Sequence, residues 1–534
     1  MRLLAHRWSW SVPAALAVAG CTVVGPDFEQ PEAPDMQAWQ QLAAAPGDAE
    51  LTARAEAPAD WWTVFDDPVL DRLIAEAHAQ NLTLRTAGIR IYEARAQLGI
   101  AVGSQYPQSQ QAGAGFSRQR ISESRSVIQD VERFIDIDPS FDNWELGIDA
   151  AWELDLWGKF RRGVQSADAN LIEQIANYDD VLVTLTGDVA ATYAAIRTLQ
   201  ERLKLVRENV ELQGEALRIA ELQFRDGTTT ELDVAEATAL LNDTESLIPQ
   251  LENAKRQATN ALGVLLGLPP GEVDALVAMP GPIPTPPPDV ALGVPADLLR
   301  RRPDIRAAEL QAAAQSAQIG VAQADLYPSF TLIGSVGLEA SDAADLFLGR
   351  SFTGVINPGI SWNFLNYGRI KNNVRVQDAR FQELVVNYQN TVLSAYQEVE
   401  DAAVAFVLAQ RQADKLATSV AAAERAVRIA LLQYRDGTAD YTRVLNTQTS
   451  LVRGQDRLVA TRGQIVANLI ALYKALGGGW QVRVGQDFLP APTRDEMAER
   501  TDWGKLLAPG AVPESDDMLE PPVAPRRFER GPDW

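Results

Sequence analysis

The second half of the chain repeats the first, and this duplication limits the possible folds more than any other feature. Three segments recur, the first at a spacing of 221 residues and the others at 210: 96–107 with 317–328, 152–169 with 362–379, and 217–228 with 427–438. The difference, 221 minus 210, gives the first copy 11 extra residues between about 116 and 145, which we expect to form a longer surface loop. A repeated sequence predicts a repeated structural unit.

The amino terminus carries a short export signal. Two arginines flank the start of a mostly apolar stretch over residues 8–19 that is too short to span a bilayer, and Val18-Ala19-Gly20-Cys21 closes it. This tetrapeptide resembles a bacterial lipobox, which implies cleavage after Gly20 and acylation of Cys21, the only cysteine. A buried free cysteine is the alternative. Thr22 follows in place of an aspartate, which in lipoprotein sorting implies the outer membrane.

These features predict six successive parts of the chain. A run of prolines after residue 280 cannot be helical and predicts a stiff linker between the copies. The last part has no periodicity, and we expect it to be extended, disordered, or part of a belt around the molecule. The parts are a signal peptide (1–20), an extended segment (21–60), the first repeat (61–279), the linker (280–296), the second repeat (297–480) and a tail (481–534).

Charge and histidine content disfavour two classes of function. The chain has 48 Lys and Arg against 71 Asp and Glu, a formal charge of -23, so a nucleic-acid partner is not expected. Only His6 and His78 are present, and His6 lies in the signal, so imidazole-based catalysis and metal binding are poorly supplied. A carboxylate pair of the glycosidase type needs no histidine, but the acids follow repeated rods and strands instead of one cleft. We therefore expect no enzyme.

Each copy contains segments that alternate between apolar and polar residues, which predicts strands with two different faces. In the first copy the apolar side consists of Trp144, Leu146, Ile148, Ala150, Trp152, Leu154 and Leu156. Its opposite side carries the acids Glu145, Asp149, Glu153 and Asp155, of which Asp155 falls near the strand's end. The second copy alternates in the same way over 330–338 and 352–364, whereas the strand near 112–117 has a weaker pattern.

Such strands suit a half-buried soluble sheet as well as a sheet that spans a membrane. The lipid anchor, the strand length near the ~9–11 residues that a tilted spanning strand needs, and tryptophans near strand ends favour a membrane sheet. Four strands cannot close alone, because unpaired backbone groups are costly in lipid and the smallest single-chain barrels have about eight strands. Several chains must then share one barrel, and three would supply twelve strands. The acids would face its lumen and favour cations.

After the second strand of each copy comes an apolar pattern in steps of three and four residues that is far longer than a usual globular helix. No proline interrupts residues 159–225, and at ~1.5 Å per residue this rod would reach on the order of 100 Å. Each rod ends at Arg-Asp-Gly-Thr, and a second apolar helix follows, over 231–266 or 441–476. The two tip turns are Arg225, Asp226, Gly227 and Thr228, and Arg435, Asp436, Gly437 and Thr438. Glycine suits the left-handed turn that closes such a hairpin.

Two motifs resemble the outer membrane efflux protein family, the TolC-like, NodT-type channel subunits of resistance-nodulation-division pumps. Residues 60–70, Asp-Trp-Trp-Thr-Val-Phe-Asp-Asp-Pro-Val-Leu, are similar to the family's opening, and residues 298–305, Leu-Leu-Arg-Arg-Arg-Pro-Asp-Ile, to its mid-chain motif. The resemblance covers about residues 60–480. In physical terms, Asp67-Pro68 and Pro303-Asp304 predict helix starts, where proline and acidic residues are favoured.

The resemblance implies a membrane α+β fold in which each protomer has two repeats of a strand pair and a long coiled-coil hairpin. It implies a homotrimer with a twelve-stranded barrel in the outer membrane, a helical barrel in the periplasm, and an equatorial belt. It also implies that the tips meet a periplasmic adaptor, which links the channel to an inner-membrane pump. The expected function is a passive exit duct for small molecules that needs no cofactor beyond the lipid at Cys21.

The aperture departs from the family's pattern. The family places a leucine, an aspartate and an arginine on the helix after the second tip, whereas this chain has Thr442, Asn446 and Thr449 there. The first copy has Leu232 and Glu236 at the matching leucine and aspartate positions. With Asp226, Asp233, Asp436 and Asp440 close by, we expect an acidic constriction that attracts cations; a solvated charged tip is the alternative.

Two other functions remain open from sequence alone. A secretion duct for whole proteins has almost the same architecture, although the lipobox favours efflux. A periplasmic adaptor is also a lipid-anchored protein with a helical hairpin, but it would lack the paired amphipathic strands.

Overall fold

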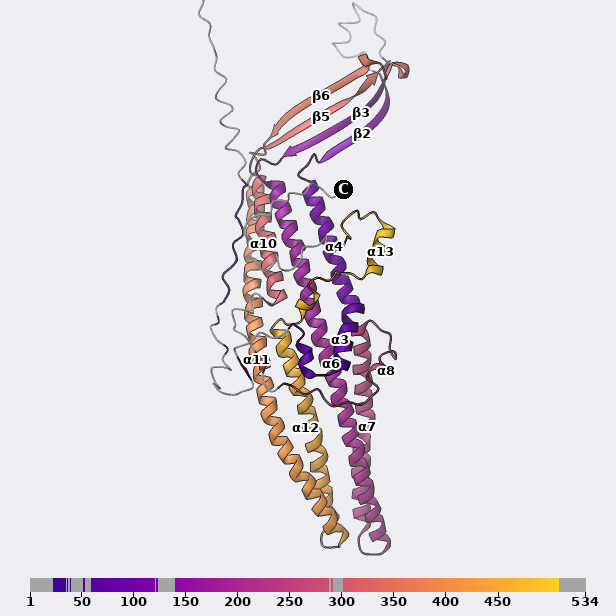
Figure 1. Ribbon diagram of the computed structural model, residues 1–534. Helices are drawn as coiled ribbons and strands as arrows, with labels where there is room; N and C mark the ends of the chain where they lie inside the picture. Colours follow the sequence, from indigo (N-terminus) through magenta and orange to yellow (C-terminus); the bar gives the residue numbers. More distant parts are fainter. Residues whose placement is uncertain are drawn as a thin grey trace, which may run out of the picture.

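The computed structural model describes residues 23–34, 36, 39, 51–52, 59–120, 122, 140–287, 290–291 and 301–508. A four-stranded sheet lies at one end, two long helical hairpins extend to the other, and shorter helices pack around the upper half (Figure 1). The signal peptide and Cys21 lie outside the described residues, as does most of the extra loop of the first copy. None of the helices in the described ranges is both long and apolar enough to cross a membrane.

The helices follow the repeat of the sequence. The hairpins are α6 (Lys159–Arg225) with α7 (Glu231–Leu266), and α11 (Arg369–Arg435) with α12 (Tyr441–Ala475). The shorter helices are α3 (Pro68–Gln80), α4 (Leu82–Gly103), α8 (Asp274–Val277), α10 (Pro303–Ala324) and α13 (Ala491–Arg500). Single 3₁₀ turns are η1 (Trp61–Phe65), η2 (Ala343–Asp345), η3 (Gly349–Ser351) and η4 (Trp480–Arg483). Both rods have 67 residues, so the prediction of two long helices is confirmed.

Local sequence signals fix where these helices begin. Gly158 and Gly368 precede the rods in the left-handed conformation, with φ of 80° and 81°. Asp67 caps α3, because its carboxylate accepts hydrogen bonds from the backbone N–H groups of Val69 and Leu70. Pro68 and Pro303 stand at the first turn of α3 and α10. The predicted helix starts at Asp67-Pro68 and Pro303-Asp304 are therefore confirmed.

The main sheet joins strands from both copies. It contains β2 (Ser109–Arg120), β3 (Ser140–Leu154), β5 (Ser329–Ala340) and β6 (Phe352–Ser361), in that spatial order and antiparallel throughout. The central pair, β3 with β5, comes from different copies, so the sheet continues across the repeat boundary. A small parallel pair, β1 (Leu51–Thr52) with β4 (Val290–Ala291), ties the N-terminal segment to the linker.

The largest hydrophobic core lies where the shorter helices surround the rods. Trp61, fully buried, stacks on Tyr473 of α12 with ring centroids 5.1 Å apart. Smaller apolar clusters continue down the hairpins, and the last of them lies just above the tips. The molecule is thus a packed waist with two slender arms, and the arms depend on helix-to-helix contacts along their length.

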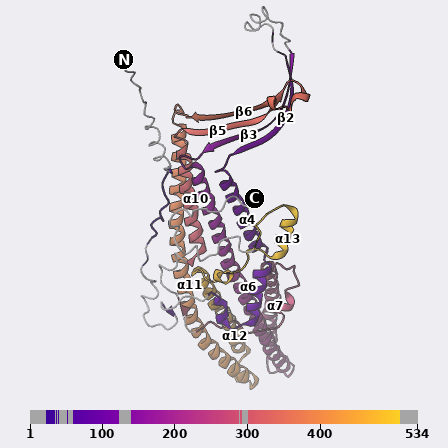
Figure 2. The ribbon, with the colours of Figure 1, turned by 45° about the horizontal axis from the view of Figure 1, so that its top comes forward.

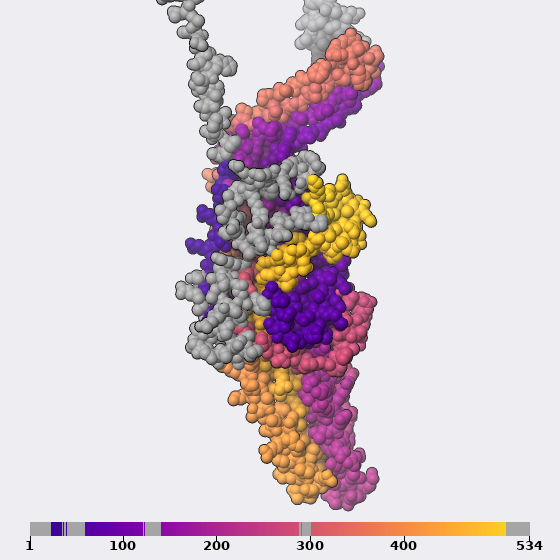
Figure 3. Space-filling model, viewed as in Figure 1, coloured from indigo at the N-terminus to yellow at the C-terminus, as the bar shows by residue number. Residues whose placement is uncertain are grey.

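The segment after residue 480 forms part of this waist. Of the alternatives for the tail, an extended or disordered segment does not describe residues 481–508, which include α13 and lie over the waist (Figure 3). A buried ion pair holds the segment, with the Arg483 guanidinium donating to both carboxylate oxygens of Asp179 on α6. Phe488 packs edge-on against Tyr178 at 5.1 Å. Periodicity missed this segment because a few anchor residues hold it in place instead of a continuous apolar face.

Candidate functional site

The sheet has one apolar face and one polar face, and the strand register lines up residues of each kind. On the apolar side, Ile148 lies opposite Val336, and Phe330 lies opposite Ile360. Many large side chains of this face are exposed, including Ile356 and Ile360. The register therefore aligns the apolar positions of β3, β5 and β6 on one side, while Ile333 and Val355 lie among the polar positions of the other side.

The polar face carries the predicted acids of β3. Glu145 lies directly opposite Glu339 of β5, and Asp149 lies opposite Ser335. Gly115 on β2 faces Glu145 from the other side, and a Cβ at Gly115 would come within 2.5 Å of that carboxylate. The glycine thus leaves room for the acid. Two carboxylates opposite one another repel, and that repulsion is relieved by water and cations.

Both outer strands, β2 and β6, have one unpaired edge among the described residues. Each edge presents a row of backbone donors and acceptors that another strand can pair with. The sheet therefore combines a lipid-compatible face, a polar face and two open edges.

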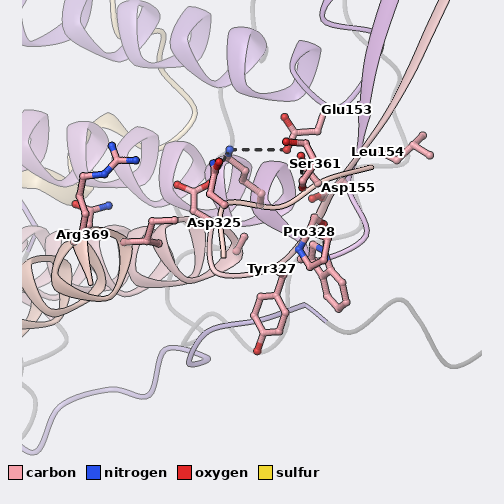
Figure 4. A pocket seen from close by; sticks show the side chains of 15 residues that line it. Glu153, Leu154, Asp155, Asp325, Tyr327, Pro328, Ser361 and Arg369 are labelled. Atoms are coloured by element: carbon pink, nitrogen blue, oxygen red, sulfur yellow. Dashed lines mark hydrogen bonds and ion pairs between the residues drawn. The ribbon is translucent and has the colours of Figure 1, made fainter. Parts of the chain in front are cut away.

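The junction between the sheet and the helices contains a cavity of about 480 Å³ lined by charged side chains. Figure 4 shows Glu153, Asp155 and Asp325 gathered at the base of the strands, with Arg369 on the adjacent helix α11. Lys159 Nζ lies 2.9 Å from Asp325 and 3.9 Å from Glu153. Burial alone would lower the pKa of Lys159, but its hydrogen bond to the Asp325 carboxylate and the nearby acids raise it above its usual value.

Asp155 differs from the other three predicted lumen acids. It lies just beyond the end of β3, and its carboxylate accepts hydrogen bonds from the backbone N–H groups of Phe160 and Arg161 and from the Arg161 side chain. Asp155 therefore anchors the first turn of α6 with its charge neutralised by an arginine, and only Glu145, Asp149 and Glu153 of the four predicted acids lie on the strand itself.

At the far end, both predicted tip turns are hairpins of the same geometry (Figure 1). Gly227 and Gly437 have φ of 73° and 68°, and the following threonines donate backbone hydrogen bonds to Gln223 and Gln433. These bonds satisfy carbonyls at the ends of the rods. The residues Arg225, Asp226, Thr228, Arg435, Asp436 and Thr438 are exposed around the turns.

One predicted aperture acid has a different environment. Asp233 at the start of α7 accepts hydrogen bonds from the Thr229 hydroxyl and, at 3.3 Å, from the hydroxyl of Tyr434 on α11. Tyr434 is buried and packs on Tyr441 with ring centroids 5.3 Å apart. Burial, first, and the neighbouring Asp233 carboxylate raise the pKa of Tyr434 to about 12, so its hydroxyl stays a donor. Asp233 therefore joins the two hairpins.

The remaining aperture residues are more open to solvent. Leu232, Thr442 and Asn446 are exposed, and Glu236 is half-buried. Asp440 caps α12 through the N–H of Arg443, and the Thr449 hydroxyl donates to the carbonyl of Leu445 on its own helix. Whether these side chains narrow an aperture depends on neighbouring copies, so their role stays a prediction.

Sequence reasoning missed Tyr434, although a signal was present. The repeat places Phe224 at the matching position, so the two copies differ there by one hydroxyl group. That hydroxyl makes one of the hydrogen bonds between the hairpins, close to another from the Gln223 amide to the Tyr434 carbonyl. The two positions also differ in packing, because Tyr434 is buried whereas Phe224 is exposed. Within the described ranges, no group of three or more His, Cys, Asp or Glu side chains is arranged to hold a metal ion.

A two-faced sheet continued by long helical hairpins defines an α+β tunnel fold of the outer-membrane channel class. The solved outer-membrane channel OprN superposes with a TM-score of 0.79 at 30% identity, over 86% of this chain and 99% of that one. The open-state MtrE outer membrane channel of Neisseria gonorrhoeae gives a TM-score of 0.72 at 26% identity, over 86% and 98%. The predicted fold class is therefore confirmed.

The chain belongs to the outer membrane efflux protein family, whose model matches residues 73–268 and 294–478. The pyoverdine export outer membrane protein OpmQ of Pseudomonas putida is 32% identical over 471 residues, covering 88% of this chain and 97% of the relative. The probable outer membrane lipoprotein SilC of Salmonella typhimurium is 28% identical, covering 88% and 98%. The family resemblance predicted from the two motifs is confirmed.

Proposed function

We propose that this protein is the outer-membrane channel subunit of a tripartite efflux pump, a passive duct for small molecules built from three copies of the chain. The observation that carries the proposal is the sheet, which has one apolar face, one polar face and two unpaired edges. In lipid such edges must be paired, because each unsatisfied backbone group costs several kcal/mol. Three four-stranded sheets would close as twelve strands around a polar lumen.

The charges on the described surfaces suit a duct that prefers cations. Glu145, Glu339 and Asp149 lie on the polar face of the sheet, and threefold repetition would arrange them as rings. Rings of carboxylates attract cations and repel anions by their summed field. The exposed Asp226 and Asp436 would extend this preference to the tips.

The hairpins suggest partners at the periplasmic end. We infer that the two tip turns contact a periplasmic adaptor, which couples the duct to an inner-membrane transporter of the resistance-nodulation-division class. Energy would come from that transporter, so we expect no cofactor and no enzymatic step in this chain. A lipid on Cys21, which lies outside the described residues, would add an anchor in the outer membrane, and the relative SilC is named a probable outer membrane lipoprotein.

Mass and conductance measurements test this proposal. Protein purified from outer membranes in mild detergent should have three times the mass of one acylated chain, and in planar bilayers it should give cation-preferring channels. The proposal is wrong if the purified protein is a water-soluble, unacylated single chain without conductance.

A protein-secretion duct is the second candidate because it shares this architecture. In cells that lack their own outer-membrane channel but carry a matching adaptor and pump, efflux predicts lower accumulation of an amphiphilic fluorescent dye when this chain is supplied. Appearance of a secreted protein in the medium without any change in dye accumulation would favour secretion instead.

A further inference from the structure

The two repeats of the protomer pack against each other through helices α6 and α10, a contact called the internal seam below. The equivalent helix surfaces on the two outer flanks of the protomer have no such partner within the described part of the chain. Within the chain, α6 packs against α10, while α4 packs on the other side of α6 and α11 on the other side of α10. Helix α11 is the repeat counterpart of α6, and α4 is the counterpart of α10. Figures 1 and 2 show α11 and α4 on opposite flanks of the upper bundle. The pairing of α6 with α10 therefore has no counterpart inside one chain.

Three contacts define the α6–α10 seam. Lys159 Nζ meets Asp325 at 2.9 Å, just beyond the end of α10. Two side-chain amides of α10 then donate to α6, Gln318 to the Ser166 hydroxyl at 2.8 Å and Gln311 to the Glu173 carboxylate at 2.9 Å. Each step moves seven residues forward along α6 and seven back along α10. Seven residues are about two helical turns, so the seam is a regular antiparallel packing.

The two flank helices can be aligned residue by residue with the two helices of the internal seam, because the repeats have no insertion within these helices. Helices α6 and α11 begin and end 210 residues apart, and α4 and α10 each have 22 residues that begin and end 221 apart. The counterpart of Glu173 is Glu383 on α11, and the counterpart of Gln311 is Arg90 on α4. Where the internal seam has a neutral amide facing a carboxylate, the flanks thus carry a cation and a carboxylate.

Exposure shows that both flanks lack their cover. Ala176 and Val183 of α6 are 2% and 4% exposed, whereas their counterparts Val386 and Leu393 on α11 are both 53% exposed. On α4, Ile100 is 72% exposed. Val386 and Leu393 are therefore apolar side chains exposed on α11 at positions that are buried on α6.

The space around two equivalent glycines, Gly320 on α10 and Gly99 on α4, shows the same difference between the covered helix and the uncovered one. A Cβ at Gly320 of α10 would lie 2.8 Å from Arg162 Cγ, so the internal seam is tightly packed there. Its counterpart on α4, Gly99, has nothing within 4 Å. At Gly320 this space holds the Arg162 side chain of α6 and, 2.9 Å from the added Cβ, the carbonyl oxygen of Val24, whereas at Gly99 it is open.

We propose that α11 of one copy docks against α4 of the next in the register of the internal seam, with a salt bridge between Glu383 and Arg90 of adjacent copies. Both side chains are exposed in the protomer. Asn177 donates to Glu173 at 3.3 Å, and Asn387 stands at the matching place beside Glu383. Glu383 therefore has the same neighbouring asparagine as Glu173, while the donor that faces it is the charged Arg90 in place of the neutral Gln311. This inference rests on the proposed assembly of several copies and specifies its contact.

The charge gives the pair a role that the internal glutamine does not need. With both partners charged, Coulomb attraction adds to the hydrogen bond, and a like charge at the same place repels. Covalent continuity holds α6 and α10 together, whereas separate copies must find their register by complementarity. The Arg90–Glu383 pair would set that register at each subunit boundary.

Cross-linking with a short bismaleimide reagent tests the register in the acylated, membrane-purified protein. Arg90→Cys with Glu383→Cys should link neighbouring subunits into covalent oligomers, and Gln97→Cys with Val376→Cys, one seam step away, should do the same. The off-register control Arg90→Cys with Val376→Cys is displaced by seven residues, about 10 Å, and should not link. Linking in the off-register control without linking in the two matched pairs would overturn the proposal.

Charge reversal tests the salt bridge itself. Arg90→Glu and Glu383→Arg should each lower the temperature at which the assembly dissociates in detergent, and the double variant should restore it. The control Arg256→Glu breaks a surface pair with Asp274 inside one chain and should leave that temperature unchanged. If the assembly forms but neither reversal matters, the inferred contact is wrong while the channel stands. If the wild type forms no assembly, the proposed function fails as well.

Discussion

The buried ion pair between Asp179 and Arg483 should control how firmly the C-terminal segment is held on the waist. The two side chains are 1% and 7% exposed, and the guanidinium also lies 4.8 Å from the centre of the Phe488 ring. Asp179→Ala leaves the arginine charge buried without its partner, a change that costs about 3–5 kcal/mol in comparable sites. Because about 1.4 kcal/mol is a tenfold change, local opening of residues 480–508 should increase roughly a hundredfold or more.

Hydrogen exchange of the intact assembly measures this effect. Amides of α13 should exchange faster in Asp179→Ala, while those in the middle of α6 keep their protection. Asp456→Ala is the matched control, since Asp456 also accepts two hydrogen bonds from one arginine, Arg202, but in a partly exposed pair worth about 0–1 kcal/mol. Replacing both buried partners, as Asp179→Leu with Arg483→Met, should recover much of the protection. Unchanged exchange in Asp179→Ala would refute the reasoning.

Four further predictions concern pH, the tips and the lumen. Burial lowers the pKa of His78 to about 4, so between pH 6.5 and about 4 the unfolded chain binds a proton that the folded protein does not bind, and the free energy of unfolding should fall as the pH drops through this range. His78→Gln should flatten this part of the curve of stability against pH, and equal curves for the variant and the wild type would contradict the prediction. Tyr434→Phe removes the hydroxyl that joins the hairpins and should raise mean single-channel conductance, whereas an unchanged or lower conductance would exclude a restraining role. Replacing Asp436 and Asp440 together with serine should alter single-channel conductance or cation preference, and unchanged traces would end the idea of an acidic constriction. Glu145→Gln should reduce cation over anion preference in a salt gradient, and an unaltered reversal potential would show that the acid does not face the conducting path.

Much of the protomer follows from local sequence signals. Proline-free apolar patterns, left-handed glycines before the rods, and Arg-Asp-Gly-Thr after them are sufficient to place both rods and their turns, because each depends on residues close in sequence. The returning helix α7 continues through Pro249. Period-two alternation likewise places β3 and β6. Strand β2 was underestimated because its glycines and alanines give little contrast between its faces, although it spans 12 residues and pairs with β3 along its length.

Other features depend on contacts between distant parts of the chain. Asp233 looks like a free acid at the tip until Tyr434, about 200 residues away, is placed beside it. The C-terminal segment is ordered by Arg483 meeting Asp179 across the waist. None of these roles is encoded by spacing along the chain.

The sequence by itself determined the duplication, the two hairpins, the two-faced strands and the family, because periodicity and turn chemistry act within a few residues. Only the tertiary structure decided which charges are free and which are bound, how the two copies share one sheet, and which helix faces stay uncovered. Those outcomes depend on burial and distance between segments far apart in the chain, which no local pattern records.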